Sequence, residues 1–165
     1  MRAVATNGEE SGRFQGFLLV LTGNMSDQVI TVRCGIFLLS PAGLAARVAC
    51  AHDCGQIINL DGVRAQVEGG ILQTLSRVLM EEVQFDRSRV TSVDWSTYPI
   101  MRFSDVPKLD IELVDRPTQP PLGAGEAACT PVGAALANAV FDATGARLRT
   151  VPFSPQRVKA ALNGA

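Results

Sequence analysis

The sequence predicts an α+β fold, in which a mixed, mainly antiparallel sheet carries two main helices on one face. Three observations indicate this class. Segments rich in β-branched and apolar residues fill the first third of the chain and return at 108–114. Apolar residues recur every three to four positions over roughly 62–80 and 131–144, which is typical of amphipathic helices. Hydrophobic residues make up 47% of the 165, enough for the core of one domain.

The β-rich segments predict a sheet of about four to six strands. Val29, Thr31 and Val32 favour strand in the second segment. Residues 45–52 are mostly apolar and therefore suit a central strand, whereas 108–114 alternate and expose one face. The predicted strands are Phe14–Leu21, Gln28–Arg33 with Ile36–Leu39 as its extension, Ala45–His52, Lys108–Val114 and a hairpin of Gln84–Phe85 with Arg89–Trp95, and turns are expected at Gly23–Asn24 and Ser40–Gly43.

The first helix carries a single apolar stripe, and we expect Asp61 to be its N-cap. Gly69 and Gly70 lie in its middle, where each glycine costs about 1 kcal/mol relative to alanine. Another part of the molecule should therefore approach the helix backbone closely there, and tight packing on the sheet is the simplest reason. The stripe consists of Val63, Val67, Ile71, Leu75, Val78 and Leu79.

The boundaries of the later helices are indicated by their capping residues. Thr130 is expected to be the N-cap of the second helix, with Pro131 as its first residue and Gly145 as its left-handed end. The same pair of a hydroxyl residue and a proline, at 154–155, precedes a short last helix, Gln156–Leu162. The sequence therefore predicts two long helices and one short one.

Composition argues against several classes of function. A net charge of −1 leaves no basic field for phosphates, so nucleic-acid binding is disfavoured. The longest apolar runs, such as Phe17–Leu21, are far shorter than the roughly 18 residues of a membrane span. No export signal is evident. We therefore expect a cytoplasmic protein without membrane partners, with residues 1–12 poorly ordered and 13–165 forming its domain.

Four cysteines and a single histidine, His52, do not form the two close ligand pairs of a zinc site. A metal site at 50–54 is a minor alternative, and buried reduced thiols in a cytosolic protein fit better. Hydrolysis is set aside because no G-x-S-x-G sequence accompanies the histidine.

A glycine-rich corner follows the proline-rich connector 116–121 and precedes the second helix. Gly123 and Gly125 would let the backbone approach a ligand closely, and Glu126 would be a suitable general base if it were held in a dry pocket. The alternative, given equal weight, is that Glu126 is an ordinary acidic residue near a helix start. A dinucleotide-binding turn is disfavoured because Pro120 and Pro121, not a buried strand, precede the glycines.

Gln66 is the second candidate, on the first helix. Its amide can donate and accept hydrogen bonds at once, which suits the edge of a heterocyclic ring. Taken alone, however, Gln66 fits an exposed helix position better.

The two candidate segments resemble a known family. Residues 54–70, CGQIINLDGVRAQVEGG, resemble the C-terminal part of the molybdopterin-binding large subunit of the xanthine dehydrogenase/aldehyde oxidase family. Gly123-Ala124-Gly125-Glu126, with ALANA at 135–139, resembles that family's final active-site loop and the helix after it. The isoquinoline 1-oxidoreductase β-subunit type is the most similar, and the resemblance runs from about 13 to 162. It implies the fold of the second molybdopterin-binding domain.

The resemblance also implies roles for individual residues. Glu126 would be the catalytic base that takes a proton from the molybdenum-bound hydroxyl. Gly123, Ala124 and Gly125 would lie against the cofactor, and Gln66 would hydrogen-bond the pterin. No metal ligand from the protein is implied, because the pterin itself holds the metal.

The implied activity is hydroxylation of an N-heterocycle, or oxidation of an aldehyde, with oxygen from water. The implied cofactor is molybdenum-molybdopterin, with the cytosine dinucleotide form favoured, and [2Fe–2S] clusters would lie on a small partner subunit. The rest of the large subunit would be a further partner, and a complex exported with a partner would be periplasmic. The alternative is a non-catalytic remnant that at most binds a partner subunit.

Overall fold

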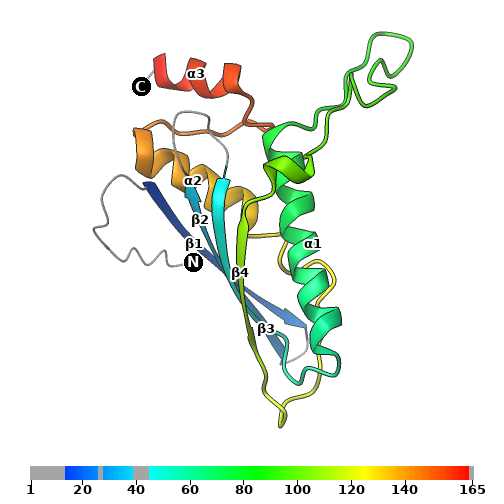
Figure 1. Ribbon diagram of the computed structural model, residues 1–165, viewed down its shortest axis with the longest axis vertical. Coiled ribbons are helices and arrows are strands. Elements are labelled where there is room, and N and C mark those ends of the chain that lie inside the picture. Colours follow the sequence, from blue (N-terminus) through cyan, green and yellow to red (C-terminus); the bar gives the residue numbers. More distant parts are fainter. Residues whose placement is uncertain (1–13, 26–27, 39–44, 164–165) are drawn as a thin grey trace.

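A four-stranded sheet with three α-helices makes up the described chain (Figure 1). The computed structural model describes residues 14–25, 28–38 and 45–163, with side chains from Arg47 onward. The strands and helices are β1 (Phe14–Met25), β2 (Gln28–Leu38), β3 (Ala45–Asp53), α1 (Leu60–Leu79), the 3-10 turn η1 (Phe103–Asp105), β4 (Lys108–Val114), α2 (Val132–Thr144) and α3 (Pro155–Asn163).

The sheet is mixed and has the strand order β1-β2-β3-β4. β1 pairs with β2 and β2 with β3 in antiparallel orientation, while β3 and β4 run parallel. The prediction of a mainly antiparallel sheet is therefore wrong for the pair of β3 and β4, the two strands whose side chains are described. The reason is that α1 runs back along the sheet, so β4 starts at the same edge as β3. Asp53 and Val114 consequently end the two strands side by side.

The first strand is longer than predicted. β1 continues through Gly23 and Asn24, so the turn expected there is wrong, because the ladder between β1 and β2 is kept up to the pair Met25–Gln28. β2 includes most of the predicted extension and ends at Leu38. The predictions for residues 1–12 and for a turn at 40–43 lie outside the described residues.

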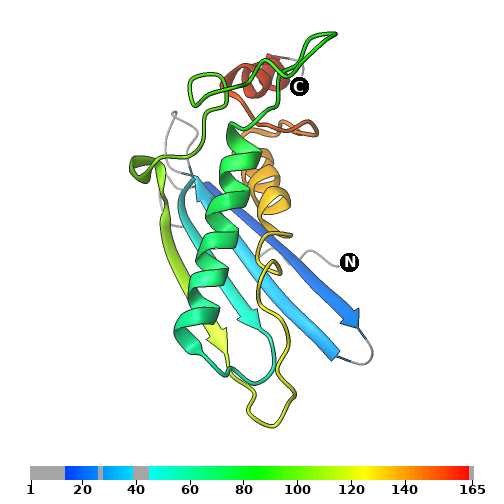
Figure 2. The same cartoon turned by 90° about the vertical axis from the view of Figure 1, so that its right-hand side faces the viewer.

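Both main helices cover one face of the sheet and enclose the core. α2 lies over β1 and β2, and α1 lies beside it against β4 (Figures 1 and 2). Alternate residues of β3 point to this face, so Val48, Cys50 and His52 are buried there. The core cluster also contains Val67, Ile71 and Leu75 of α1 and Val132, Ala135, Leu136 and Ala139 of α2. None of the helices in the described part of the chain is long and apolar enough to cross a membrane.

The helix starts differ from prediction by one or two residues. Asn59, not Asp61, is the N-cap of α1, and its side-chain oxygen accepts a bond from the Gly62 amide at 2.8 Å. α2 begins at Val132 with Pro131 as its N-cap. The Thr130 hydroxyl, which was expected to cap the helix, instead donates to the Ala127 carbonyl. At the other end of α2, Gly145 has φ +74° and ends the helix as predicted.

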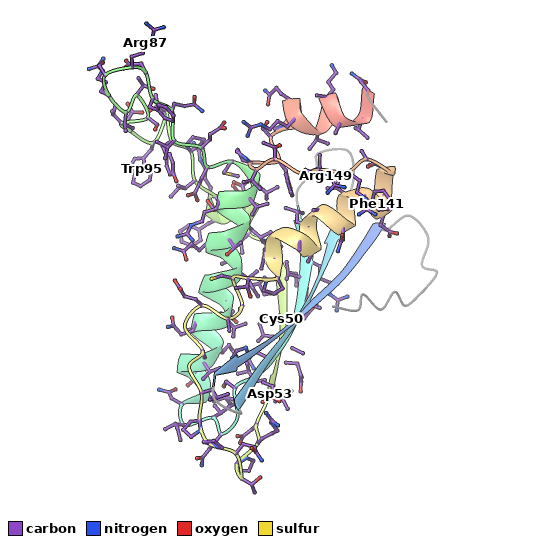
Figure 3. All side chains as sticks on the ribbon, turned by 180° about the vertical axis from the view of Figure 1, so that it is seen from behind. Cys50, Asp53, Arg87, Trp95, Phe141 and Arg149 are labelled. Atoms are coloured by element: carbon purple, nitrogen blue, oxygen red, sulfur yellow. The ribbon has the colours of Figure 1, made fainter. Side chains whose placement is uncertain are left out.

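Residues 83–99 form an arm that projects from the end of α1, with Arg87 and Trp95 on it (Figure 3). The predicted hairpin is present in reduced form, as a single bridge between Phe85 and Val90. Asp86 shapes its turn by accepting bonds from the residues that follow it. The arm therefore has a folded backbone of its own while most of its side chains face solvent.

Candidate functional site

The two sequence segments singled out as candidates are joined by backbone hydrogen bonds. The Leu122 amide donates to the Cys54 carbonyl at 2.8 Å, and the Arg116 amide donates to the Gly55 carbonyl at 3.1 Å. The connector 116–121 is not fully extended, because the Gln119 amide donates back to the Arg116 carbonyl. This turn brings the connector alongside the segment between β3 and α1.

Gly55 is the position where the two segments come closest. Its φ is +77°, a left-handed conformation that residues with a side chain rarely adopt. A Cβ atom added to Gly55 would lie 2.2 Å from the backbone oxygen of Pro120. Only glycine therefore allows the connector to rest on this turn.

Side chains at the ends of the parallel strands also hold the two segments together. Asp53 accepts a bond from the Gly55 amide at 3.0 Å and forms an ion pair with Arg116 at 2.9 Å. Asp115, just beyond β4, accepts a bond from the Ile57 amide at 3.0 Å. Both carboxylates thus fix loops at the same edge of the sheet, at the end of β3 where Figure 3 labels Asp53.

A groove of about 270 Å³ opens between these segments and the start of α1. Gln66, Ala124 and Gly125 line it, so three of the four residues expected to bind a cofactor share one cavity. A Cβ on Gly125 would stand 3.8 Å from Nε2 of Gln66, inside the space between them. The groove is further lined by Cys54, Gln56, Ile58, Asn59, Gly62, Val63, Pro121 and Leu122. We call it the Gln66 groove.

Glu126 follows directly on the rim of the Gln66 groove, and its side chain is exposed. The expectation of a dry pocket around it is therefore not met by this chain alone, because nothing in the described residues covers that side. Gly123, the fourth expected cofactor residue, is likewise exposed and does not line the cavity. Any shielding of Glu126 has to come from atoms outside the described chain.

The turn that carries Glu126 rests on the middle of α1. The Cys129 amide donates to the Glu126 carbonyl at 3.0 Å, which closes the turn. A Cβ on Gly70 would lie 3.1 Å from the Cys129 sulfur, so this glycine admits the turn against the helix. The predicted close approach is thus confirmed at Gly70, although the turn and not the sheet makes it. Gly69 has open space instead.

His52 and its neighbouring thiols lie in the core behind the groove. Burial lowers the pKa of His52 below 6.5, against the opposing charge of Asp53, and neither ring nitrogen has a partner in the described chain. Burial also raises the pKa of the Cys54 thiol. Across the described residues no three metal-ligating side chains come together. These groups are therefore packed as neutral core residues.

Several residues of the site were not identified from the sequence. Asn59 is one, because its role as N-cap brings it to the groove, and an asparagine before a helical stripe is a signal that could have located it. The pair of Asp53 and Arg116 is another, and it has no local signal because 63 residues separate the partners.

Comparison with known proteins gives matches to a family of domains and to subunits of several enzymes. The family described as molybdopterin cofactor-binding domain matches residues 45–107. A nicotinate dehydrogenase subunit of Pseudomonas putida is 41% identical over 152 residues, which are 92% of this chain and 12% of that protein. The beta subunit of isoquinoline 1-oxidoreductase from Brevundimonas diminuta is 39% identical over 110 residues, or 67% of this chain and 14% of that protein.

A solved structure has a similar fold. Quinoline 2-oxidoreductase from Pseudomonas putida 86 superposes with a TM-score of 0.69 at 24% identity, covering 82% of this chain and 19% of that chain. This likeness shows a shared fold, and the shares covered show that the chain spans a small part of each relative's length. The family match and the sequence relatives together establish that the chain belongs to the xanthine dehydrogenase/aldehyde oxidase family and corresponds to a portion of its molybdopterin-binding subunit.

Proposed function

We propose that the chain is the C-terminal, cofactor-binding part of a molybdenum hydroxylase. The observation that carries this proposal is the Gln66 groove, which joins Gln66 to Gly125 although 58 intervening residues separate them in the sequence. Both residues belong to motifs that resemble the family's cofactor-contacting segments. A relative that is 41% identical is named a nicotinate dehydrogenase subunit, which supports an N-heterocycle as the substrate class.

The lining of the groove fits part of a pterin cofactor. An amide at Gln66 offers both a donor and an acceptor to a ring edge. Gly125 lacks the Cβ that would narrow the cavity beside this amide, so its backbone can approach a flat ligand. At about 270 Å³ the groove would hold only part of the whole cofactor, which agrees with a chain that supplies one side of the site.

The chain's own residues would bind, orient and exchange a proton. When bound, the molybdopterin cofactor supplies two-electron redox chemistry. Gln66 would fix the orientation of the ring, and the backbone at 124–125 would set its depth in the groove. Glu126, on the rim, would accept a proton at its carboxylate during hydroxylation. Its exposure here requires a neighbouring polypeptide to exclude water from it.

Four finer points are part of the proposal. We favour the cytosine dinucleotide form of the cofactor and [2Fe–2S] clusters on a small partner subunit, both from the resemblance. Both sequence relatives are named as subunits of their enzymes, which supports assembly with other chains. Free thiols at Cys54 and Cys129 support a reducing compartment, so the cytoplasm is the proposed location.

A second candidate is a non-catalytic remnant that only binds a partner. The exposure of both Gln66 and Glu126 favours it, since none of the residues that the structure describes shields either side chain. The two candidates differ in whether a completed subunit carries molybdenum and turns over substrate.

The deciding experiment is a graft. In the nicotinate dehydrogenase subunit of Pseudomonas putida, the 152-residue segment that matches this chain is replaced by this chain, and the product is expressed with its partner chain in a molybdenum-replete host. We expect bound molybdenum and hydroxylation of nicotinate. In this graft, Glu126→Gln should lower kcat by about 10²–10⁴-fold with molybdenum retained.

Gln66→Ala should instead lower the molybdenum content of the graft. The matched control for the base is Glu112→Gln, an exposed carboxylate on β4 outside the Gln66 groove. A graft that folds but never carries molybdenum supports the remnant. If Glu126→Gln leaves turnover unchanged, Glu126 is not the general base.

A further inference from the structure

The far end of α1 carries a second and larger groove, of about 550 Å³, between the helix and residues 100–106. Phe103 is fully exposed at its edge, and Ile100 is 43% exposed. The groove is mainly apolar, with Leu72, Ile100, Met101, Phe103 and Val106 among its lining side chains. We call it the Phe103 groove. A fully exposed phenylalanine beside an apolar cavity marks a surface that another molecule covers.

The Phe103 groove is held in shape by hydrogen bonds. The Met101 amide donates to the Ser76 hydroxyl of α1 at 3.0 Å, and Ser76 itself is bonded to Glu81. The Arg102 amide donates to Asp105 at 3.1 Å, which closes the turn that presents Phe103. The backbone of the turn that carries Phe103 is therefore held by contacts that do not involve the phenylalanine ring.

The two grooves lie along the same side of α1. Gln66, Gly69 and Gln73 are exposed and follow helical spacing, and Gly69 has open space where a side chain would be. Gln66 lines the first groove and Gln73 lines the second. Seven residues of helix correspond to about 10 Å. In Figure 2 this helix lies in front of the sheet, with no other helix or strand covering its outer side.

We propose that the Phe103 groove binds the remaining part of the molybdopterin-binding subunit, the polypeptide that would also cover the Gln66 groove. This inference rests on the proposed function. Relatives contain far more polypeptide than this chain, which matches 12–14% of their length. A segment that covers Gln66 needs only about 10 Å more along α1 to reach Gln73, which lines the Phe103 groove.

The chemistry of the groove fits a polypeptide partner better than a small ligand. Its lining is mainly apolar and also includes Arg102 and Glu81, and such a combination of apolar and charged side chains is usual in a protein interface. An aromatic side chain presented by a fixed turn is typical of an anchor residue.

The test compares one substitution in two settings, both without cofactor. Phe103→Ser is introduced into the isolated chain and into the graft described above, and both are produced in a host that makes no molybdenum cofactor. We expect no change in Tm for the isolated chain and a fall of about 2–4 °C for the graft. The control is Leu162→Ser on α3, also exposed in the chain, which should leave the Tm of the graft unchanged. Hydroxyl-radical footprinting should show Phe103 protected in the graft and reactive in the isolated chain.

Each outcome decides the inference. Protection of Phe103 together with the selective fall in Tm supports it. Phe103 that stays reactive in the folded graft overturns it, as does a dimer of the isolated chain that Phe103→Ser abolishes, because the groove would then serve a second copy. The cofactor is absent throughout, so a groove that binds polypeptide in a graft that never gains molybdenum leaves this inference standing and removes only the catalytic proposal.

Discussion

The two ends of α1 are stabilised by different means. At its start, the Gln66 groove depends on backbone contacts, with Gly55 beneath the connector and paired amides and carbonyls on either side. At its far end, the Phe103 groove depends on side chains, chiefly the Ser76 hydroxyl and the Glu81 carboxylate, which also accepts a bond from Tyr98 at 2.8 Å. One helix therefore supports two surfaces, of which one is held by backbone contacts and the other by side-chain hydrogen bonds.

The difference follows from what each surface is proposed to contact. A flat cofactor needs close approach, which small residues and exposed backbone allow. A polypeptide partner needs an anchor side chain in a fixed position, which requires hydrogen bonds from neighbours to hold its turn. Substitutions that add a side chain should therefore damage the start of α1, and substitutions that remove one should damage its far end.

The largest effect is expected at Gly55. Gly55→Ala adds a Cβ 2.2 Å from the Pro120 oxygen in a left-handed backbone conformation, and it should lower the free energy of unfolding by about 3–4 kcal/mol. Urea denaturation measures it. The matched control is Gly69→Ala, in open space within a helix, which should raise stability by about 0.5–1 kcal/mol. If the Gly55 variant were as stable as the parent, close backbone contact at Gly55 would not be what stabilises the start of α1.

The next effect is expected at Ser76. Ser76→Ala leaves the Met101 amide without its acceptor and should cost about 1–3 kcal/mol in urea denaturation. Ser104→Ala is the control, because that hydroxyl is exposed and bonds only to its neighbour Asp105. The two variants should differ by at least about 1 kcal/mol. A loss of the same size in both would mean that the buried hydroxyl does not hold the segment.

A pH effect is expected from His52, at the end of β3. Because burial lowers the pKa of His52 in the folded state, the unfolded chain binds more protons near and below pH 6.5. Stability should be fully present above pH 6.5 and fall as the pH decreases toward the lowered value, by up to about 1.4 kcal/mol per pH unit. Denaturation at pH 7.5 and 5.5 measures the fall. His52→Leu should reduce it, since the sequence has no other histidine.

The smallest effect is expected at Gly70, between the two ends. Gly70→Ala places a Cβ 3.1 Å from the Cys129 sulfur, and this crowding should cancel or outweigh the gain in helix propensity, for a net loss of up to about 1 kcal/mol. Adding Cys129→Ala should relieve the crowding, so the double variant should be more stable than the sum of the single effects predicts. Simple additivity in thermal unfolding would show that the sulfur is not the obstacle.

Much of the fold could be predicted because its signals are local. The stripe through Val67, Ile71 and Leu75 identified α1 by its period, and Gly145 marked the end of α2. The start of α1 was predicted wrongly at Asp61, because Asn59 and Asp61 are both good N-caps and the sequence does not show which turn closes first.

The errors and gaps arose where distant segments decide the structure. Gly23 and Asn24 favour a turn locally, yet their pairing with β2 keeps them in a strand. The contact between Gly55 and Pro120 consists of backbone atoms and has no signature in the residue types alone. Three of the predicted cofactor residues do share a groove, but the exposure of Glu126 depends on what surrounds the chain, which no local pattern encodes.

Gly70 has a mechanical consequence. The turn that carries Glu126 rests on α1 at this residue, and the segment that presents Phe103 is bonded to Ser76 near the other end of the same helix. A polypeptide that binds the Phe103 groove at one end of α1 would therefore also determine the position of the Glu126 carboxylate, so assembly of the subunit and alignment of the reacting groups would occur together.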